Sequence, residues 1–420
     1  MPELQFDEKA VASLTLGDVV RQTAKNYPDV RFRPDIYQTS PHYTFAGINA
    51  HNFPIWLTAD GIGTKPELAE RLYEDSLVEG NPTPEVFESL AFDTLAMIDG
   101  DEARFGRYMV GAANVIDMNN AKNVEVISAL AGGLKRACNE GHFALINGET
   151  AELGYRTSGA GRNRLNWNAV GVSVFNPAKL ILGDDLKPGQ PIIALREQSI
   201  RSNGLSKARA ILEADYLLRQ GLKSKSEYVL RELTDRGVIL GDNDIEGLLA
   251  SIFGHDAFEQ VLPPWHRENP EVTKQLLTPS RLYGPAMYLA QGRIDEPKQV
   301  ELTAAAHITG GGIPEKTRRM VERAGLGVSL DAVFPQPEAV TSLMAIANTF
   351  PNDVREKIQI DDRTACEQWN GGIGFLAVAA NDSEANKYVN ILEDEGFEAA
   401  VAGRVIDKPE IQFRGHTWTY

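Results

Sequence analysis

The stretch Trp56-Leu57-Thr58-Ala59-Asp60-Gly61-Ile62-Gly63-Thr64-Lys65 places an acid, two glycines, a hydroxyl group and a lysine directly after an apolar run. Glycines let backbone amides approach an oxyanion, lysine supplies a positive charge, and aspartate is a ligand for hard metal ions. The same residues also suit an ordinary strand-to-helix turn in which Asp60 caps the helix. The stretch therefore predicts a strand that ends in a turn, with phosphate binding as one possible role of that turn.

Composition indicates a globular protein that is large enough for two domains. The chain has 420 residues, of which 43% are hydrophobic and 24% charged. Its formal net charge of −16 argues against a surface for nucleic acid or an anionic membrane, which would need a basic face. No basic segment followed by an apolar one opens the chain, and no apolar run could span a bilayer, so we expect neither a signal peptide nor a membrane span. Cys138 and Cys366 define no disulfide or zinc pattern, and a reducing, cytoplasmic location is expected.

Alternating strand-like and helical segments predict a mixed α/β fold. Expected helices cover residues 16–27, 66–78, 85–97, 124–140 (ended by Gly141), 205–220, 282–291, 314–324 and 338–348. Expected strands cover residues 53–57, 108–116, 143–146, 165–175 and 191–195, one further strand ends at His307, and a strand–helix–strand unit covers 374–405. The polar passage at residues 176–189 marks the expected seam between an N-terminal domain (1–176) and a C-terminal domain (177–420), with an insertion at 221–275.

Two acidic segments are predicted to form turns near this first stretch. Asp99-Gly100-Asp101-Glu102 follows an apolar helix, and Asn147-Gly148-Glu149-Thr150 follows the apolar strand at residues 143–146. Magnesium is typically held by one or two carboxylates, with phosphates and water completing its shell. Ligands of α/β sheets gather at the carboxyl ends of strands, where Glu149 is expected to emerge. Solvated helix caps and a plain structural turn are the alternative interpretations.

Two glycine-containing turns precede predicted helices in the second half. In Ser202-Asn203-Gly204 either polar side chain could cap the next helix, and exposed amides there would also form an anion site. His307-Ile308-Thr309-Gly310-Gly311-Gly312-Ile313-Pro314 carries three consecutive glycines, which are entropically costly and favour phosphate contact over a plain loop. His307 is either a buried core histidine or a titratable group beside a substrate.

Two standard nucleotide signatures are missing from the chain. No Gly-x-x-x-x-Gly-Lys-Ser/Thr segment occurs, which excludes a P-loop enzyme. Gly159-Ala160-Gly161 continues to Arg164 where a dinucleotide fingerprint needs glycine, so a Rossmann site is disfavoured. A nucleotide site in this protein would be of another kind.

Taken in order, these segments resemble the aminoimidazole ribonucleotide synthetase family, also called phosphoribosylformylglycinamidine cyclo-ligase, and its wider ATP-dependent superfamily. The matching segments, which span about residues 46–405, are Asp60–Lys65, Ala96–Asp101 with Gly106, Gly148–Glu152, Ser202–Gly204, Leu277–Tyr283, Ala306–Gly312 and Asn370–Gly374. The resemblance implies an N-terminal domain that forms a dimeric β-barrel with ATP sites at the interface, and a C-terminal α/β domain that binds substrate.

The resemblance also implies a reaction and its residues. ATP, with Mg²⁺, phosphorylates the formyl oxygen of formylglycinamidine ribonucleotide, and the amidine nitrogen then closes the ring of aminoimidazole ribonucleotide in purine biosynthesis. The implied catalytic residues are Lys65, His307 and Glu149; the ATP-binding residues are Asp60, Gly61, Gly63, Thr64, Lys65 and Asp101; the metal ligands are Asp60, Asp101 and Glu149; and the substrate-phosphate residues are Ser202, Asn203, Gly204, Gly310, Gly311 and Gly312.

The chain departs from the family pattern in several places, among them Arg201, residues 110–120 and the insertion at 221–275, and two other functions stay open. Arg201 stands where the family usually has a histidine, and arginine cannot act as a general base near neutral pH. The alternatives are a relative that phosphorylates another amide or small acceptor with ATP, and a non-catalytic nucleotide-binding homologue. Leu277–Tyr283 with the His307 turn favours the purine reaction. Catalysis is favoured by the presence of Asp60, Lys65, Asp101 and Glu149.

Overall fold

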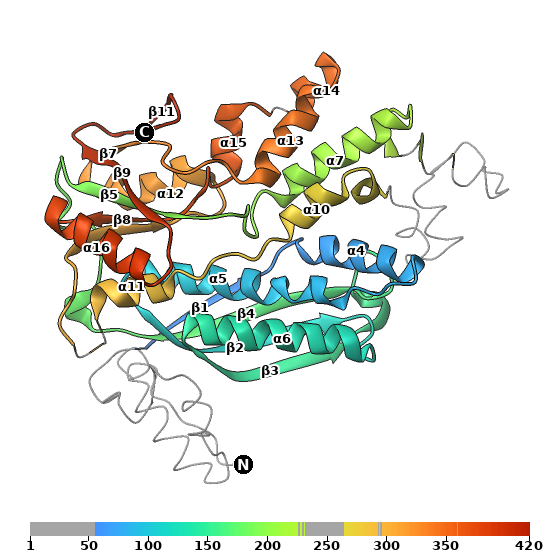
Figure 1. The fold of residues 1–420 in the computed structure, drawn as a ribbon, viewed down its shortest axis with the longest axis horizontal. Coiled ribbons are helices and arrows are strands. Elements are labelled where there is room, and N and C mark those ends of the chain that lie inside the picture. The colour runs from blue at the N-terminus through green and yellow to red at the C-terminus, as the bar shows by residue number, and fades with distance from the viewer. Residues whose placement is uncertain are drawn as a thin grey trace, which may run out of the picture.

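The computed structural model describes residues 55–420 except 226, 229–230, 232–263, 293, 295 and 359. Two sheets with helices packed against them form this part of the chain (Figure 1). The predicted mixed α/β class is therefore confirmed. The predicted helix at residues 16–27 and most of the predicted insertion at 221–275 lie outside the described residues. None of the described helices is long and apolar enough to cross a membrane.

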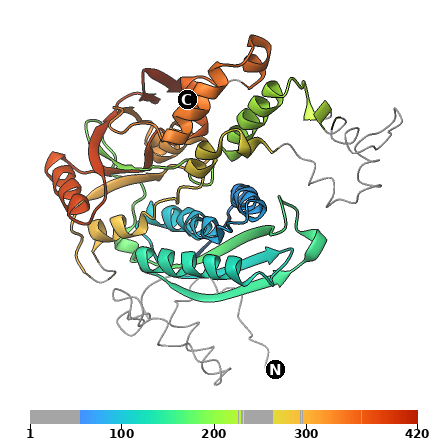
Figure 2. The same cartoon turned by 45° about the vertical axis from the view of Figure 1, so that its right-hand side comes forward.

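The first half of the described chain builds a four-stranded sheet of order β1-β4-β2-β3 with three long helices. Its elements are β1 (Ile55–Gly61), α4 (Pro66–Val78), α5 (Ser89–Ala103), β2 (Tyr108–Met118), α6 (Val124–Gly141), β3 (Ala144–Glu152) and β4 (Leu165–Val174). β4 pairs antiparallel with β1 and β2, while β2 and β3 run parallel. The helices lie between this sheet and the second half (Figure 2).

The second half builds a seven-stranded sheet of order β11-β10-β7-β9-β5-β8-β6. Its elements are β5 (Pro191–Arg196), α7 (Leu205–Arg219), α10 (Pro270–Leu276), α11 (Gly284–Gln291), β6 (Leu302–His307), α12 (Gly312–Val321), β7 (Gly327–Leu330), α13 (Glu338–Asn348), α14 (Asn352–Ile358), α15 (Asp362–Gln368), β8 (Ile373–Ala379), α16 (Asp382–Asp394), β9 (Ala399–Ile406), β10 (Glu410–Phe413) and β11 (His416–Thr419). Every residue of β8 is buried, as a continuous apolar strand requires when both faces of its sheet are covered.

The predicted seam at residues 176–189 lies between β4 and β5, and thus between the two sheets. A single apolar cluster nevertheless contains Leu95 of α5, Ile211 of α7 and Leu343 of α13. Helix α5 is buried along almost its whole length because it lies between the halves, and its buried acids Asp93, Asp99 and Glu102 have polar partners. The division into residues 1–176 and 177–420 stays a proposal.

Three segments that were predicted as turns lie inside regular elements. β1 continues through Asp60 to Gly61, and α5 includes Asp99–Glu102. β3 continues through Asn147–Thr150, so the expectation that Glu149 emerges at a strand end was wrong. The parallel ladder with β2 pairs Asn114 with Gly148 and Val115 with Glu149, and this pairing outweighs the low strand propensity of asparagine and glycine.

Two helix caps also differ in the structure from their predictions. Gly141 is the last residue of α6, and His142 takes the left-handed conformation after it, with φ of 60°. A Cβ atom at Gly141 would lie 2.1 Å from the Phe143 ring, so packing explains the glycine. Helix α7 begins after Gly204, whose φ is 70°, and neither preceding polar side chain caps it.

Candidate functional site

The glycine turns that were predicted to bind phosphate lie next to one another. A Cβ built on Gly63 would lie 3.8 Å from the Ser202 carbonyl oxygen, and one on Gly310 would lie 3.4 Å from Asn203 Oδ1. Three segments far apart in the sequence therefore meet at the starts of α7 and α12. Helix N-termini present backbone N–H groups and a positive dipole end, which suit a phosphate group.

The same turns are held against Trp369 at the end of α15. A Cβ on Gly204 would lie 2.3 Å from Trp369 Nε1, and one on Gly312 would lie 2.7 Å from the Trp369 carbonyl oxygen. Both glycines also have positive φ, 70° and 61°, which disfavours any side chain. These two glycines are therefore explained by close packing and backbone conformation as well as by any ligand.

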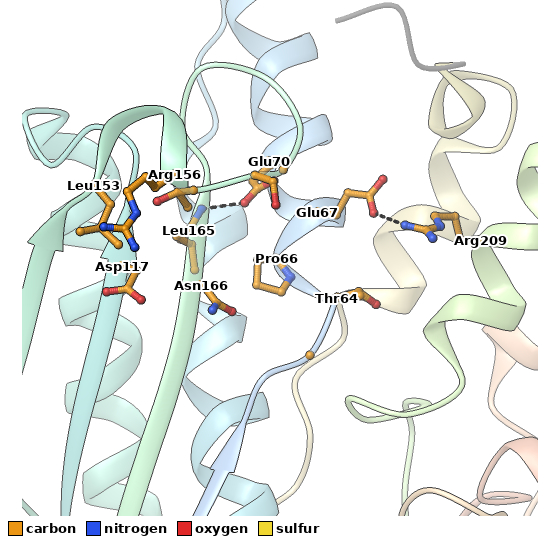
Figure 3. A pocket seen from close by; sticks show the side chains of 14 residues that line it. Thr64, Pro66, Glu67, Glu70, Asp117, Leu153, Arg156, Leu165, Asn166 and Arg209 are labelled. Atoms are coloured by element: carbon orange, nitrogen blue, oxygen red, sulfur yellow. Dashed lines mark hydrogen bonds and ion pairs between the residues drawn. The ribbon is translucent and has the colours of Figure 1, made fainter. Parts of the chain in front are cut away.

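A cavity of about 450 Å³ opens beside the start of α4 (Figure 3). It is lined by Gly63, Thr64, Pro66, Glu67, Glu70, Asp117, Leu153, Arg156, Thr157, Ser158, Gly159, Leu165, Asn166 and Arg209. Arg209 of α7 reaches across to Glu67 of α4, with 2.8 Å between Nη1 and Oε2. The cavity therefore combines the predicted phosphate turn with two arginines and lies between the two halves.

Glu70 fixes one wall of this cavity. Its carboxylate accepts hydrogen bonds from the backbone N–H of Ala160 (2.7 Å) and of Leu165 (2.8 Å). Burial raises the pKa of Glu70 to about 8, although both hydrogen bonds oppose the shift. The loop between β3 and β4 is thus attached to α4 by one buried acid, which sequence reasoning did not identify.

Lys65 lies beside this cavity but does not line it. Its side chain is fully buried, and Nζ lies 2.7 Å from Asp93 Oδ1 and 3.0 Å from the Thr278 carbonyl oxygen. Burial lowers the pKa of Lys65 and raises that of Asp93, while the charge of each partner opposes the other's shift. The structure uses Lys65 to tie α5 to the 278–280 segment, and its assignment to ATP stays a prediction.

His307, at the end of β6, also has a partner at each of its ring nitrogens. Its Nδ1 lies 3.1 Å from Asp101 Oδ1, and its Nε2 lies 2.8 Å from Arg201 Nη2. Because arginine only donates, Nε2 must accept, so the neutral ring carries its proton on Nδ1 and donates it to Asp101. Burial, and next the positive charge of Arg201, lower the pKa of His307 to about 4, which agrees with a neutral ring.

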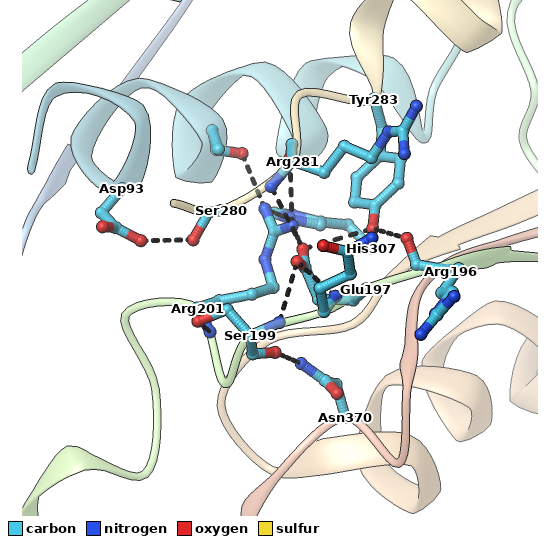
Figure 4. A network of polar contacts seen from close by, with 12 residues as sticks. Asp93, Arg196, Glu197, Ser199, Arg201, Ser280, Arg281, Tyr283, His307 and Asn370 are labelled. Carbon is cyan, nitrogen blue, oxygen red and sulfur yellow. Dashed lines mark hydrogen bonds and ion pairs between the residues drawn. The ribbon is translucent and has the colours of Figure 1, made fainter. Parts of the chain in front are cut away.

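Arg201 is the centre of the buried network around His307 (Figure 4). Its side chain is fully buried, and Nη1 lies 2.5 Å from Glu197 Oε2. The guanidinium also donates to the carbonyl oxygens of Ala96 (3.2 Å) and Arg281 (3.1 Å). Its φ of 61° is unusual for arginine and is held by these contacts. Glu197 was not identified from the sequence, because no local pattern marks an acid whose partners come from other elements.

The three predicted metal ligands divide between the two faces of the first sheet. Asp60 pairs with buried Ala169, whereas Glu149 pairs with exposed Val115, and paired residues of a sheet share a face. Burial, and also the negative charge of Asp101, raise the pKa of Asp60, so these two acids are neighbours on the helix-covered side. Among the described residues, no three His, Cys, Asp or Glu side chains gather to hold one metal ion.

The other acids predicted near Asp101 have structural partners. Asp99 Oδ2 accepts the backbone N–H of Gly284 at 2.7 Å, at the start of α11, and burial raises the pKa of Asp99 to about 7. Glu102 accepts a hydrogen bond from Thr58 of β1. Since consecutive residues of a helix point in different directions, only Asp101 faces His307.

Comparison with known proteins shows similarity to one family. Residues 235–416 match the family described as AIR synthase related protein, C-terminal domain. Curated phosphoribosylformylglycinamidine cyclo-ligases are similar over most of the chain. The one from Carboxydothermus hydrogenoformans is 25% identical over 362 residues, 85% of this chain and 82% of the relative; the one from Methanothermobacter thermautotrophicus is 25% identical over 409 residues, 97% and 93%. The resemblance predicted from the motifs is confirmed.

Solved structures are similar to this chain at lower sequence identity. A thiamine-monophosphate kinase from Stenotrophomonas maltophilia K279a has a TM-score of 0.47 and 15% identity, covering 87% of this chain and 86% of that one. The hydrogenase maturation protein HypE in complex with ATP has a TM-score of 0.45 and 11% identity, covering 97% and 96%.

Proposed function

We propose that this chain is a cytoplasmic, ATP-dependent cyclo-ligase that converts formylglycinamidine ribonucleotide to aminoimidazole ribonucleotide. The observation that carries the proposal is the meeting of the turns at Gly63, Ser202–Gly204 and Gly310–Gly312, next to the cavity at α4. Curated relatives with this activity match the chain over most of its length. ATP, when bound, supplies the phosphoryl group that makes the formyl oxygen a leaving group.

The residues present fit a nucleotide with a divalent cation. Asp60 is exposed and lies near enough to Asp101 for the two charges to interact, and Mg²⁺ is commonly held by one or two carboxylates with phosphate oxygens. Asp60 and Asp101 would hold the cation. The turn around Gly63 and Thr64, with Arg209, would contact the nucleotide, and the glycine turns of α7 and α12 would hold the ribonucleotide phosphate.

The buried residues act on this site by positioning. His307 donates to Asp101 and accepts from Arg201, so it orients the carboxylate toward the cation and does not need to transfer a proton itself. Burial alone would raise the pKa of Asp101, but the hydrogen bond from His307 and the nearby cations lower it, which keeps the carboxylate ionised. Fixed groups of this kind reduce reorganisation when charge develops during the reaction.

A homodimer is part of the proposal. The face of the first sheet away from the helices exposes Leu57, Val115 and Val170 in the described part of the chain. An apolar sheet face favours pairing with a second copy, and such pairing would agree with the dimeric barrel that the family resemblance implies. Glu149 lies on this face, so it would reach a nucleotide held between two copies.

The direct test is ADP release by purified protein with magnesium and ATP, with and without formylglycinamidine ribonucleotide, together with a colorimetric assay of aminoimidazole ribonucleotide. We expect ADP release that depends on the ribonucleotide and equals the product formed. ATP binding without turnover would exclude the cyclo-ligase reaction and direct the search to other phosphoryl acceptors.

A further inference from the structure

A small cavity of about 120 Å³ lies beside Asp101 at the end of β6, on the helix-covered side of the site. Its polar lining comes from α5 (Asp101), the residue after α5 (Arg104), β6 (His307) and α12 (Lys316, Arg319). Three cations and one acid surround it, while His307 is neutral, so its potential is positive. The volume admits one phosphate group but not a nucleoside.

Two of the three cations already have acidic partners. Arg104 Nε lies 3.7 Å from Asp101 Oδ1, and Arg319 forms an ion pair with Glu315 within α12. Lys316 forms no ion pair with the part of the chain that the structure describes. Its side chain is half-buried. A partly buried charge without a partner is unfavourable and favours binding of an anion.

Lys316 also connects the two predicted halves of the site. It lies four residues after Gly312, hence one helical turn along α12 from the glycine turn. Its side chain lines the same cavity as Asp101, one of the two carboxylates proposed to hold the cation. A phosphate group in this cavity would therefore meet Lys316 one helical turn from the glycine turn.

Lys65 does not supply that charge in this structure. Its ammonium group is fully buried in its ion pair with Asp93, and neither group lines a cavity near Asp101. Moving it to a ligand would leave the Asp93 carboxylate buried without a counter-charge, which is strongly unfavourable. Lys65 is therefore a structural lysine, whereas Lys316 is available to contact a ligand.

We propose that Lys316 is the lysine that contacts a phosphate group in this site, and that the cavity beside Asp101 holds that phosphate. The inference deepens the proposed function and rests on it for the identity of the ligand. Either the ribonucleotide phosphate or the terminal phosphate of ATP has the required chemistry, so the test includes both sources.

The experiment measures binding by titration calorimetry for two probes, ribose 5-phosphate and a non-hydrolysable ATP analogue with magnesium. Lys316→Ala is expected to weaken one probe about tenfold to hundredfold, as loss of a charge-assisted hydrogen bond does. Lys316→Arg should retain most of the affinity. Lys274→Ala is the matched control, because Lys274 is exposed on α10 and paired with Glu271.

The affected probe identifies the phosphate: ribose 5-phosphate indicates the ribonucleotide, and the analogue indicates ATP. Unchanged binding of both probes by Lys316→Ala, or no binding of either by the wild type, would overturn the proposal. Thermal unfolding of each variant shows whether it is folded, and Lys316→Gln replaces any alanine variant that is not. Phosphate binding that depends on Lys316 without cyclo-ligase activity would contradict only the proposed reaction.

Discussion

The guanidinium of Arg201 lies against His307, with 2.8 Å between Nη2 and the ring nitrogen Nε2. This contact fixes the ring as the Nδ1–H tautomer and leaves it no free nitrogen, since Nδ1 faces Asp101. The family resemblance places a histidine where this chain has Arg201. In this protein the arginine instead lies beside another histidine, His307, whose two ring nitrogens both have partners.

Arg201→Met should destabilise the protein strongly. The substitution leaves Glu197 buried without its partner, which typically costs about 3–5 kcal/mol of unfolding free energy. Urea unfolding monitored by fluorescence measures the loss. The double variant Glu197→Gln with Arg201→Met should recover part of it, and a single variant as stable as the wild type would contradict the network described here.

His307 should make the protein less stable in mild acid. Its pKa is about 4 in the folded state and near 6.5 when unfolded, so the unfolded state binds more protons between these values. The neutral His307 ring makes its full contribution to the free energy of unfolding, about 3 kcal/mol, above pH 6.5. This contribution is lost as the pH falls toward 4. Unfolding free energies at several pH values, compared with those of His307→Gln, isolate this effect, and parallel curves would refute it.

Lys65→Met should act first on stability. The variant leaves Asp93 buried and without a counter-charge, and we expect a loss of about 3–5 kcal/mol. Chemical unfolding gives the value, and activity is then measured at a temperature where the variant is folded. Normal stability with lost ATP binding would instead assign Lys65 directly to the nucleotide.

Gly100→Ala should disturb His307 from the helix side. A Cβ at this position would lie 2.5 Å from the imidazole ring, and overpacking of this kind usually costs about 1–3 kcal/mol. Gly132→Ala, in α6, is the control, because the nearest atom to the new Cβ would be Glu88 Oε1 at 3.7 Å and alanine is the better helix former. The control should gain up to about 1 kcal/mol. Thermal unfolding of both variants measures the difference in stability. Equal changes in the two variants would rule out a clash with His307.

Leu57→Asp and Val170→Asp should prevent the proposed dimer without unfolding the chain. Both side chains are exposed on the open face of the first sheet, where a buried charge at an interface would be unfavourable. Light scattering after size-exclusion chromatography should show a dimer for the wild type and a monomer for the variants. Val124→Asp should remain dimeric, because Val124 is exposed at the start of α6, away from the open face of the sheet. A monomeric wild type would refute this interface.

Local sequence patterns determined most elements of the described fold. Helix α4 lies at the predicted residues 66–78, and α13 at 338–348, because each has a proline or acid at its start and apolar residues at helical spacing. The motifs that meet at Gly63, Ser202 and Gly310 were also visible as glycine turns before helices. Turn chemistry and periodicity are local properties, so they can be recognised without the fold.

Longer-range contacts determined what local patterns predicted wrongly. Asn147–Thr150 is strand and not turn because β2 pairs with it, and Asp99–Glu102 is helix because each acid finds a partner in another element or in the site. The low strand propensity of Asn-Gly is outweighed by the ladder of backbone hydrogen bonds. Such pairings depend on residues far away in the sequence.

The sequence by itself determined the alternating α/β elements, the acidic surface charge and the family resemblance, since these follow from composition, periodicity and motif order. Only the tertiary structure decided which ionisable groups are available. Lys65 is buried in an ion pair with Asp93, and His307 is buried against Arg201. Lys316, in contrast, lines a cavity. Burial and pairing set the charge and reach of a side chain, and both arise only when distant segments pack together.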